Sequence, residues 1–223
     1  MSKLNPRQQE AVNYIDGPLL VLAGAGSGKT SVITRKIAYL IEKCGIKGNN
    51  IAAVTFTNKA AREMKERVSQ LVSGPAARGL IVSTFHNLGL NILRKEHAAL
   101  GYKSGFSIFD QQDAQALIKD LLIQEHGSDG DQTDTIQQRI SNWKNDMVSP
   151  EQAVAQADGP ADMLCAQAYS RYTRALKAYN ALDFDDLILL PVQLFQQLTA
   201  LLQKWQRRTL CMLVDESQDT NIS

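Results

Sequence analysis

The stretch "PLLVLAGAGSGKTSVITRKIAYLIEKCG" (residues 18–45) decides the fold. Its apolar run, residues 18–23, predicts a buried parallel strand because it is short, continuous and ended by glycines. The residues that follow place apolar side chains on one helical face, and Gly45 is typical of a helix end. A strand that enters a helix through a glycine-rich turn is the arrangement of a phosphate-binding loop.

The glycine-rich turn itself, "AGAGSGKT" (residues 23–30), has the chemistry of nucleotide binding. Its glycines let successive backbone N–H groups point inward, toward phosphates held at the positive end of the following helix. Lys29 would reach the β- and γ-phosphates of the nucleotide, and the Thr30 hydroxyl would ligate Mg²⁺. The alternative is a merely flexible turn, and Ala23 departs from the strict pattern, although a small residue suffices there. The predicted nucleotide-binding residues of the turn are Ala23, Gly24, Ala25, Gly26, Ser27, Gly28, Lys29 and Thr30.

Strands alternate with helices around this loop, which indicates an α/β fold with a parallel sheet. Residues 51–56 and 79–85 read as strands, and residues 58–72 as the helix between them. From about residue 87 to 208 the pattern is nearly all helical, with Asp110 and Ser149 as helix caps. Strand character returns at 209–214. We expect a sheet-forming segment over 1–85, a helical block over 86–208 and a return strand within 209–223.

The composition is that of a globular protein with 44% hydrophobic and 21% charged residues. Residues 1–85 carry a balance of +7 and residues 86–223 a balance of −6, which is compatible with polyanion binding in one part. Three cysteines in no metal-binding pattern suggest reduced thiols in a cytosol. The first thirty residues lack a leader and no apolar run suits a membrane span, so we expect a cytoplasmic protein without membrane contact.

The last residues, "LVDESQDTNIS" (213–223), present two acids directly after an apolar run. Successive residues at the end of a strand point in different directions, so Asp215 and Glu216 could take separate roles beside a bound nucleotide. The alternative is a pair of solvated acids in a turn. The upstream phosphate loop favours the first interpretation.

Several separated segments share one resemblance. In order along the chain they are "LNPRQQEAV" (4–12), "AAVTFTNKAAREMKERV" (52–68), "VSTFHNLGL" (82–90), "SNWKND" (141–146), "LDFDDLILL" (182–190) and "LVDESQDTN" (213–221). Together with the phosphate loop they resemble the N-terminal half of superfamily-one DNA helicases of the Rep/UvrD/PcrA family. The resemblance implies an incomplete RecA-like P-loop domain, called 1A, interrupted by an all-helical subdomain, 1B. It also implies ATP-driven 3′-to-5′ movement along single-stranded DNA.

The resemblance assigns roles to single residues around the nucleotide. Gln8 would read the adenine edge, although a residue that only caps its helix is the simpler interpretation without the family. Asp215 would hold Mg²⁺, with Thr30, and Glu216 would act as the base toward the attacking water. Lys29, Asp215 and Glu216 are therefore the predicted catalytic residues, and Gln218 and Asp219 would begin a relay toward DNA.

The predicted DNA contacts lie in two motifs, "TFTNKAA" and "STFH". Phe56 and Phe85 each close a strand and could stack on unpaired bases, which contributes roughly 1–3 kcal/mol per base. Hydroxyl, amide, imidazole and ammonium groups nearby could bind phosphates or sugars. The alternative is that one phenylalanine belongs to the core and that His86 is a helix cap. The predicted DNA-binding residues are Thr55, Phe56, Thr57, Asn58, Lys59, Thr84, Phe85 and His86.

The helical block holds two motifs with competing interpretations. "DFDDL" (183–187) resembles a metal site, but acids are common at helix starts, and we expect a structural role. Trp143 and Lys144 could contact duplex DNA, although Trp143 fits a core position equally well. Two residues depart from the family pattern: Ser31 replaces a basic residue and Ser217 replaces an aromatic one.

The family resemblance implies a second RecA-like domain, which this sequence does not contain. That domain supplies an arginine to the γ-phosphate, so we expect no helicase activity and very slow ATP hydrolysis from the chain alone. The alternative is a truncated, non-catalytic module that binds nucleotide or DNA. Single-stranded DNA and duplex junctions are the implied partners, and replication or repair proteins stay open. A third alternative, a small-molecule P-loop kinase, does not account for the motifs "TFTNKAA" and "DESQDT".

Overall fold

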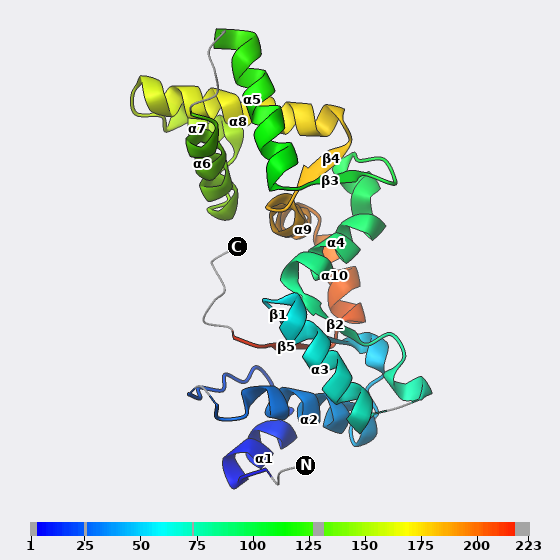
Figure 1. The fold of residues 1–223 in the computed structure, drawn as a ribbon. Coiled ribbons are helices and arrows are strands. Elements are labelled where there is room, and N and C mark those ends of the chain that lie inside the picture. Colours follow the sequence, from blue (N-terminus) through cyan, green and yellow to red (C-terminus); the bar gives the residue numbers. More distant parts are fainter. Residues whose placement is uncertain (1–3, 25, 73, 127–131, 217–223) are drawn as a thin grey trace. The chain divides into compact units, whose positions relative to one another are not determined.

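The computed structural model describes residues 4–216, apart from 25, 73 and 127–131 (Figure 1). The described chain forms two compact units. One unit consists of residues 4–88 and 200–216, and the other of residues 89–199. Each unit has its own hydrophobic core and is treated by itself.

The first unit is built on a three-stranded parallel sheet. Its strands are β1 (Ile51–Thr55), β2 (Ile81–Thr84) and β5 (Cys211–Val214), in the order β2-β1-β5. The register pairs Val54 with Ser83 on one side and with Val214 on the other. All three strands were predicted from their apolar runs, and the parallel pairing confirms the α/β class.

Three helices accompany this sheet: α1 (Pro6–Asn13), α2 (Lys29–Glu42) and α3 (Asn58–Leu71). Helices α2 and α3 pack on one face of the sheet, where Ile37 and Met64 are fully buried against Ala53 of β1. Short 3-10 turns, η1 (Gly48–Asn50) and η2 (Pro75–Ala77), lie before β1 and β2. The core therefore fixes the strand ends relative to the start of α2.

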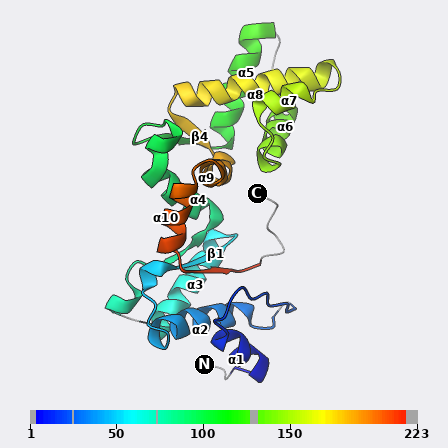
Figure 2. The same ribbon diagram turned by 180° about the vertical axis from the view of Figure 1, so that it is seen from behind.

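The expected first strand, residues 18–23, is not a strand. Figures 1 and 2 draw this segment as a loop between α1 and α2, and Leu20 and Leu22 are 69% and 85% exposed. A strand requires a partner for its backbone groups, and none of the strands in the described part of the chain pairs with this segment. The apolar composition of residues 18–23 was therefore not enough to predict a strand.

The second unit is mainly helical. Its helices, with α4 and α10 crossing the boundary between the units, are α4 (Phe85–Glu96), α5 (Gln111–His126), α6 (Thr133–Asn145), α7 (Pro150–Ala155), α8 (Pro160–Ala178), α9 (Asp186–Gln197) and α10 (Thr199–Arg208); η3 (His97–Leu100) follows α4. Both predicted caps are present: the Asp113 N–H donates to Asp110 Oδ1 at 2.9 Å, and Ser149 forms a capping box with Gln152. None of the described helices is long and apolar enough to span a membrane.

The expectation of an all-helical block was wrong at one place. Strands β3 (Ser107–Phe109) and β4 (Ala181–Asp183) form a two-stranded parallel sheet within the second unit. The Ser107 N–H donates to the Asn180 carbonyl at 3.1 Å, and Asn180 has a positive φ of 52° that turns the chain into β4. Three-residue strands give too short a pattern to be recognised in a helical sequence.

Candidate nucleotide-binding site

The phosphate loop ends at the first residue of α2. Gly26 and Gly28 have φ values of +74° and +85°, a conformation that glycine adopts without strain. Gly28 occupies the N-cap position of α2, which begins at Lys29. The first backbone N–H groups of the helix have no partner within the helix, and they face the loop. This geometry suits an anion, as predicted; Ala25 lies outside the described residues.

The Lys29 side chain folds back over the loop. Its Nζ donates to the carbonyl oxygen of Ala23 at 2.8 Å and to that of Gly24 at 3.3 Å. These are neutral acceptors at the surface, so an anion in the loop would compete favourably for the ammonium.

Gln8 connects α1 to the phosphate loop. Its Oε1 accepts from the Asn5 N–H at 2.9 Å, which closes a capping box, and its Nε2 donates to the Ser27 carbonyl at 2.9 Å. The capping role weighed from the sequence is therefore present, together with a loop contact that the sequence did not reveal. Both ends of the amide are engaged, and adenine recognition by Gln8 stays a prediction.

The carboxylate strand reaches the loop across 185 residues of sequence. Thr30 Oγ1 donates to Asp215 Oδ2 at 3.3 Å, and the Glu216 N–H donates to Asp215 Oδ1 at 3.1 Å. Asp215 is 7% exposed, whereas Glu216 is exposed and has a positive φ of 55°. The two acids thus differ in environment, as expected for a strand end, and an unusual backbone conformation turns the second one outward.

The oxygen atoms around Asp215 fit a magnesium ion. A hydroxyl and a carboxylate oxygen are hard donors, which Mg²⁺ prefers. In the part of the chain that the structure covers, no lysine or arginine forms an ion pair with Asp215. A buried carboxylate without a protein cation is favourable for a metal ion, which Asp215 and Thr30 would hold together.

The two predicted DNA motifs meet at the ends of β1 and β2. The rings of Phe56 and Phe85 are 5.3 Å apart at an interplanar angle of 53°, and both side chains are half-buried. The two rings form one aromatic pair. Neither phenylalanine is fully buried in the core, and the two do not offer separate stacking surfaces.

The remaining predicted DNA residues divide by exposure. Thr57, Asn58, Lys59 and His86 are exposed, whereas Thr55 and Thr84 are 0% and 5% exposed. Thr57 caps α3 by accepting from the Ala60 N–H at 3.1 Å. The sequence did not single out Asn87, whose Nδ2 donates to Asn58 Oδ1 at 3.3 Å and whose N–H donates to Thr84 Oγ1 at 3.3 Å. No motif spacing signals such a link between the first turns of two separate helices, α3 and α4.

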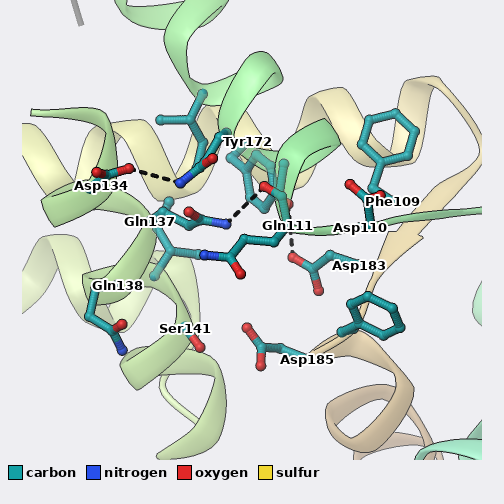
Figure 3. A pocket seen from close by; sticks show the side chains of 15 residues that line it. Phe109, Asp110, Gln111, Asp134, Gln137, Gln138, Ser141, Tyr172, Asp183 and Asp185 are labelled. Atoms are coloured by element: carbon teal, nitrogen blue, oxygen red, sulfur yellow. Dashed lines mark hydrogen bonds between the residues drawn. The ribbon is translucent and has the colours of Figure 1, made fainter. Parts of the chain in front are cut away.

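A cavity of about 410 Å³ lies in the second unit and is unsuited to phosphate (Figure 3). Its lining includes four aspartates and four glutamines and neither lysine nor arginine. Figure 3 shows Asp183 and Asp185 beside this space, with Tyr172 donating to Asp183 Oδ2 at 2.9 Å. Polyanions are repelled from such a lining.

A buried ion cluster lies beneath this cavity. Lys144 Nζ donates to Asp183 Oδ2 at 2.7 Å and to Asp186 Oδ1 at 2.8 Å. Burial and the neighbouring Asp183 carboxylate raise the pKa of Asp186 to about 6, whereas Lys144 lowers the pKa of Asp183. The two carboxylates raise the pKa of Lys144 despite its burial, so the ammonium keeps its charge. "DFDDL" is therefore structural, as preferred from the sequence.

The suggested DNA contact of Lys144 was wrong. Its side chain is 2% exposed and bound to two carboxylates, so it cannot reach a phosphate. Trp143 stacks on Tyr169 at 5.7 Å between centroids and 14° between planes, with the Arg139 guanidinium over its ring. Trp143 thus packs against the helical core.

A phosphate loop at a helix start, joined by Thr30 to the carboxylate that follows a parallel strand, is the arrangement typical of P-loop nucleotide-binding proteins. The family model described as the UvrD/REP helicase N-terminal domain matches residues 4–223, and the chain belongs to this family. The chain is 55% identical to the ATP-dependent DNA helicase Rep of Escherichia coli (strain K12), over 99% of this chain and 33% of that protein. It is 44% identical to the ATP-dependent DNA helicase PcrA of Bacillus subtilis (strain 168), over 99% of this chain and 30% of that protein. It therefore spans about a third of the length of these curated relatives.

Proposed function

We propose that this chain is the ATP-binding N-terminal portion of a DNA helicase that moves 3′-to-5′ along single-stranded DNA. The observation that carries this proposal is the contact of Thr30 with Asp215 at 3.3 Å, which brings the phosphate loop to the carboxylate strand. The names of the relatives, both ATP-dependent DNA helicases, support the substrate class.

Each group at the loop would contact a different part of the bound nucleotide. The loop N–H groups and the start of α2 would hold the phosphates, and Lys29 would leave its two carbonyl partners for the β- and γ-phosphates. Thr30 and Asp215 would hold Mg²⁺, which when bound neutralises phosphate charge. Glu216, exposed beside Asp215, would take the proton of the attacking water.

Single-stranded DNA would cross the carboxyl ends of β1 and β2. The Phe56–Phe85 pair would offer an aromatic surface to unpaired bases, and the exposed Lys59 and His86 would contact the backbone. Parallel sheets commonly bind ligands at this edge, so nucleotide and DNA would lie on one sheet. Thr55 and Thr84, being buried, would support this edge from within.

The division into domains is also a proposal. The sheet-containing segments 1–85 and 209–223 would belong to RecA-like domain 1A, and 86–208 to subdomain 1B. The relatives are about three times as long as this chain, and we infer that their further length supplies the second RecA-like domain. Cytoplasmic location and contacts with replication or repair proteins stay predictions from the sequence and the family.

Nucleotide titration tests the proposal most directly. The 223-residue chain should bind Mg²⁺–ADP, and Lys29→Ala should lose most of that affinity because the phosphates lose their charged partner. Lys119→Ala, an exposed lysine on α5, is the matched control and should bind as the unmodified chain does. Equal, negligible binding by the unmodified chain and Lys29→Ala would contradict the proposal.

A second candidate function is a non-catalytic module that binds nucleotide or DNA without turnover. The observation behind it is that the chain covers only about a third of the length of its helicase relatives. Nucleotide binding without ATP hydrolysis, in the presence of single-stranded DNA, would support this function over the first.

A further inference from the structure

Three polar side chains form a row across the carboxyl end of the sheet. Thr55 is in register with Thr84 on β2, and Val54 is in register with Val214 on β5. The Asp215 N–H donates to the Val54 carbonyl at 3.0 Å, which continues the parallel ladder and places Asp215 opposite Thr55. The row therefore runs Thr84, Thr55, Asp215.

The row lies on the face of the sheet that α2 and α3 cover. Ile51 and Ala53 of β1 pack in the core with these helices, and side chains alternate along a strand, so Thr55 shares their face. Leu213 packs against the same core, which places Asp215 on this face as well. Thr30, on the first turn of α2, reaches Asp215 from there.

The central hydroxyl of the row has no hydrogen-bond partner. Thr55 is fully buried, and none of the residues in the described ranges pairs with its Oγ1. Its neighbours in the row are engaged: Thr84 Oγ1 accepts from Asn87, and Asp215 accepts from Thr30 and Glu216. A buried hydroxyl without a partner is costly, and such groups in native proteins call for a specific explanation.

Asp215 can accept the missing hydrogen bond. A carboxylate offers about four acceptor positions, and the described residues use two of them, one on each oxygen. The carboxylate and the Thr55 hydroxyl face the same side of neighbouring strands. A small closure of this strand end around a ligand would bring them together.

We propose that Thr55 is a positioning residue for the metal-holding carboxylate, an inference that rests on the proposed function. When Mg²⁺ and nucleotide occupy the loop, the Thr55 hydroxyl donates to Asp215 and fixes the orientation of its carboxylate toward the metal. Partners that orient a metal ligand commonly change metal affinity by roughly 10- to 100-fold. Thr55, predicted from the sequence to contact DNA, thus acts on the nucleotide side of β1.

The experiment compares Thr55→Val, which removes the hydroxyl at nearly constant shape, with Thr55→Ser, which keeps it. ADP binding to the 223-residue chain is measured by calorimetry over a series of Mg²⁺ concentrations. We expect Thr55→Val to raise the Mg²⁺ concentration that gives half of the increase in ADP affinity by roughly 10-fold or more. Thr55→Ser should bring this concentration most of the way back to the value of the unmodified chain. ADP affinity without Mg²⁺ should stay unchanged, and the Tm of the ligand-free Thr55→Val chain should be equal or higher because an unpaired hydroxyl is removed.

The outcomes separate this inference from the proposed function. If Lys29→Ala loses ADP binding while Thr55→Val shows the Mg²⁺ dependence of the unmodified chain, the role of Thr55 is refuted and the nucleotide site stands. If Thr55→Val lowers the ligand-free Tm and weakens ADP equally with and without Mg²⁺, Thr55 is only structural. If the unmodified chain binds no better than Lys29→Ala, the proposed function fails and this inference fails with it.

Discussion

Asp215 in the sheet-containing unit and Asp183 in the helical unit are equally buried, at 7% exposure, and each stands at the end of a short parallel strand. Each accepts from a hydroxyl: Asp215 from Thr30 at 3.3 Å, and Asp183 from Tyr172 at 2.9 Å. The two carboxylates differ in whether a positively charged side chain lies beside them. Lys144 lies 2.7 Å from Asp183, whereas Asp215 has no ion pair among the described residues.

The difference separates a structural carboxylate from one that we propose holds a metal ion. Asp183 shares the ammonium of Lys144 with Asp186 and also accepts from a backbone N–H, so its charge is satisfied within the protein. Asp215 keeps unused acceptor positions at the sheet edge where ligands bind. A buried acid after a strand is therefore a candidate metal ligand only when the fold supplies no cation for it.

The largest expected effect is in catalysis by the first unit. If a second domain supplies the arginine finger, as we infer, the 223 residues assayed alone should turn over ATP roughly 10³–10⁵ more slowly than a full-length relative, since an arginine finger contributes that factor in comparable nucleotidases. A steady-state ATPase assay with single-stranded DNA, using a full-length relative as the control, measures it. Turnover close to that of the intact helicase would show that the site of Asp215 is already complete.

Removal of Lys144 should have the largest effect on stability. Lys144→Met leaves two carboxylates buried without a cation, which should lower the free energy of unfolding by about 3–5 kcal/mol. Lys29→Met is the matched control and should change it by less than about 0.5 kcal/mol, because Lys29 bonds only to carbonyls at the surface. Urea denaturation measures both variants, and a similar loss in the two would remove the distinction between the regions.

Amide substitution of the two acids compares them directly. Asp183→Asn should lower the free energy of unfolding by about 2 kcal/mol, because it weakens buried bonds to Lys144 and Tyr172. The free energy of unfolding of Asp215→Asn should stay within about 1 kcal/mol of that of the unmodified chain, since the bond of its carboxylate to Thr30 is long, while its Mg²⁺-dependent ADP binding falls. Greater destabilisation by Asp215→Asn than by Asp183→Asn would reverse the assignment.

The smallest expected effect is a pH dependence that belongs to the helical unit. The pKa of Asp186 is raised to about 6 by burial and by Asp183, so the folded protein retains a proton that the unfolded chain releases near pH 4. The free energy of unfolding should therefore decrease as the pH rises from about 4 to 6. The lowered pKa of Asp183 acts below this window.

Asp186→Asn provides the control for this pH dependence. The variant keeps a neutral partner beside Lys144, and its unfolding curves between pH 4 and 6 should lose the slope assigned to Asp186. Denaturant unfolding at several pH values measures it. An unchanged slope in the variant would assign the pH dependence to another group.

Local patterns predicted much of the first unit and failed at one informative place. Strands β1, β2 and β5 and helices α2 and α3 were found from apolar periodicity, and their ends carry the predicted site residues. Residues 18–23 have an equally apolar pattern but no neighbour in the described sheet. Composition measures the tendency of a segment to be buried, whereas strand formation also requires hydrogen-bond partners elsewhere in the chain.

The sequence by itself determined the P-loop class, the family and the identity of the acids, because these depend on residue types at fixed local spacings. Only the tertiary structure decided what each group meets. It buried Lys144 between two aspartates, joined Phe56 to Phe85, and left the hydroxyl of Thr55 unpaired beside the strand of Asp215. The Phe56–Phe85 and Lys144 contacts join residues about thirty to forty positions apart, and the Thr30–Asp215 contact joins residues 185 positions apart. Packing brings them together through side chains whose local patterns are ordinary.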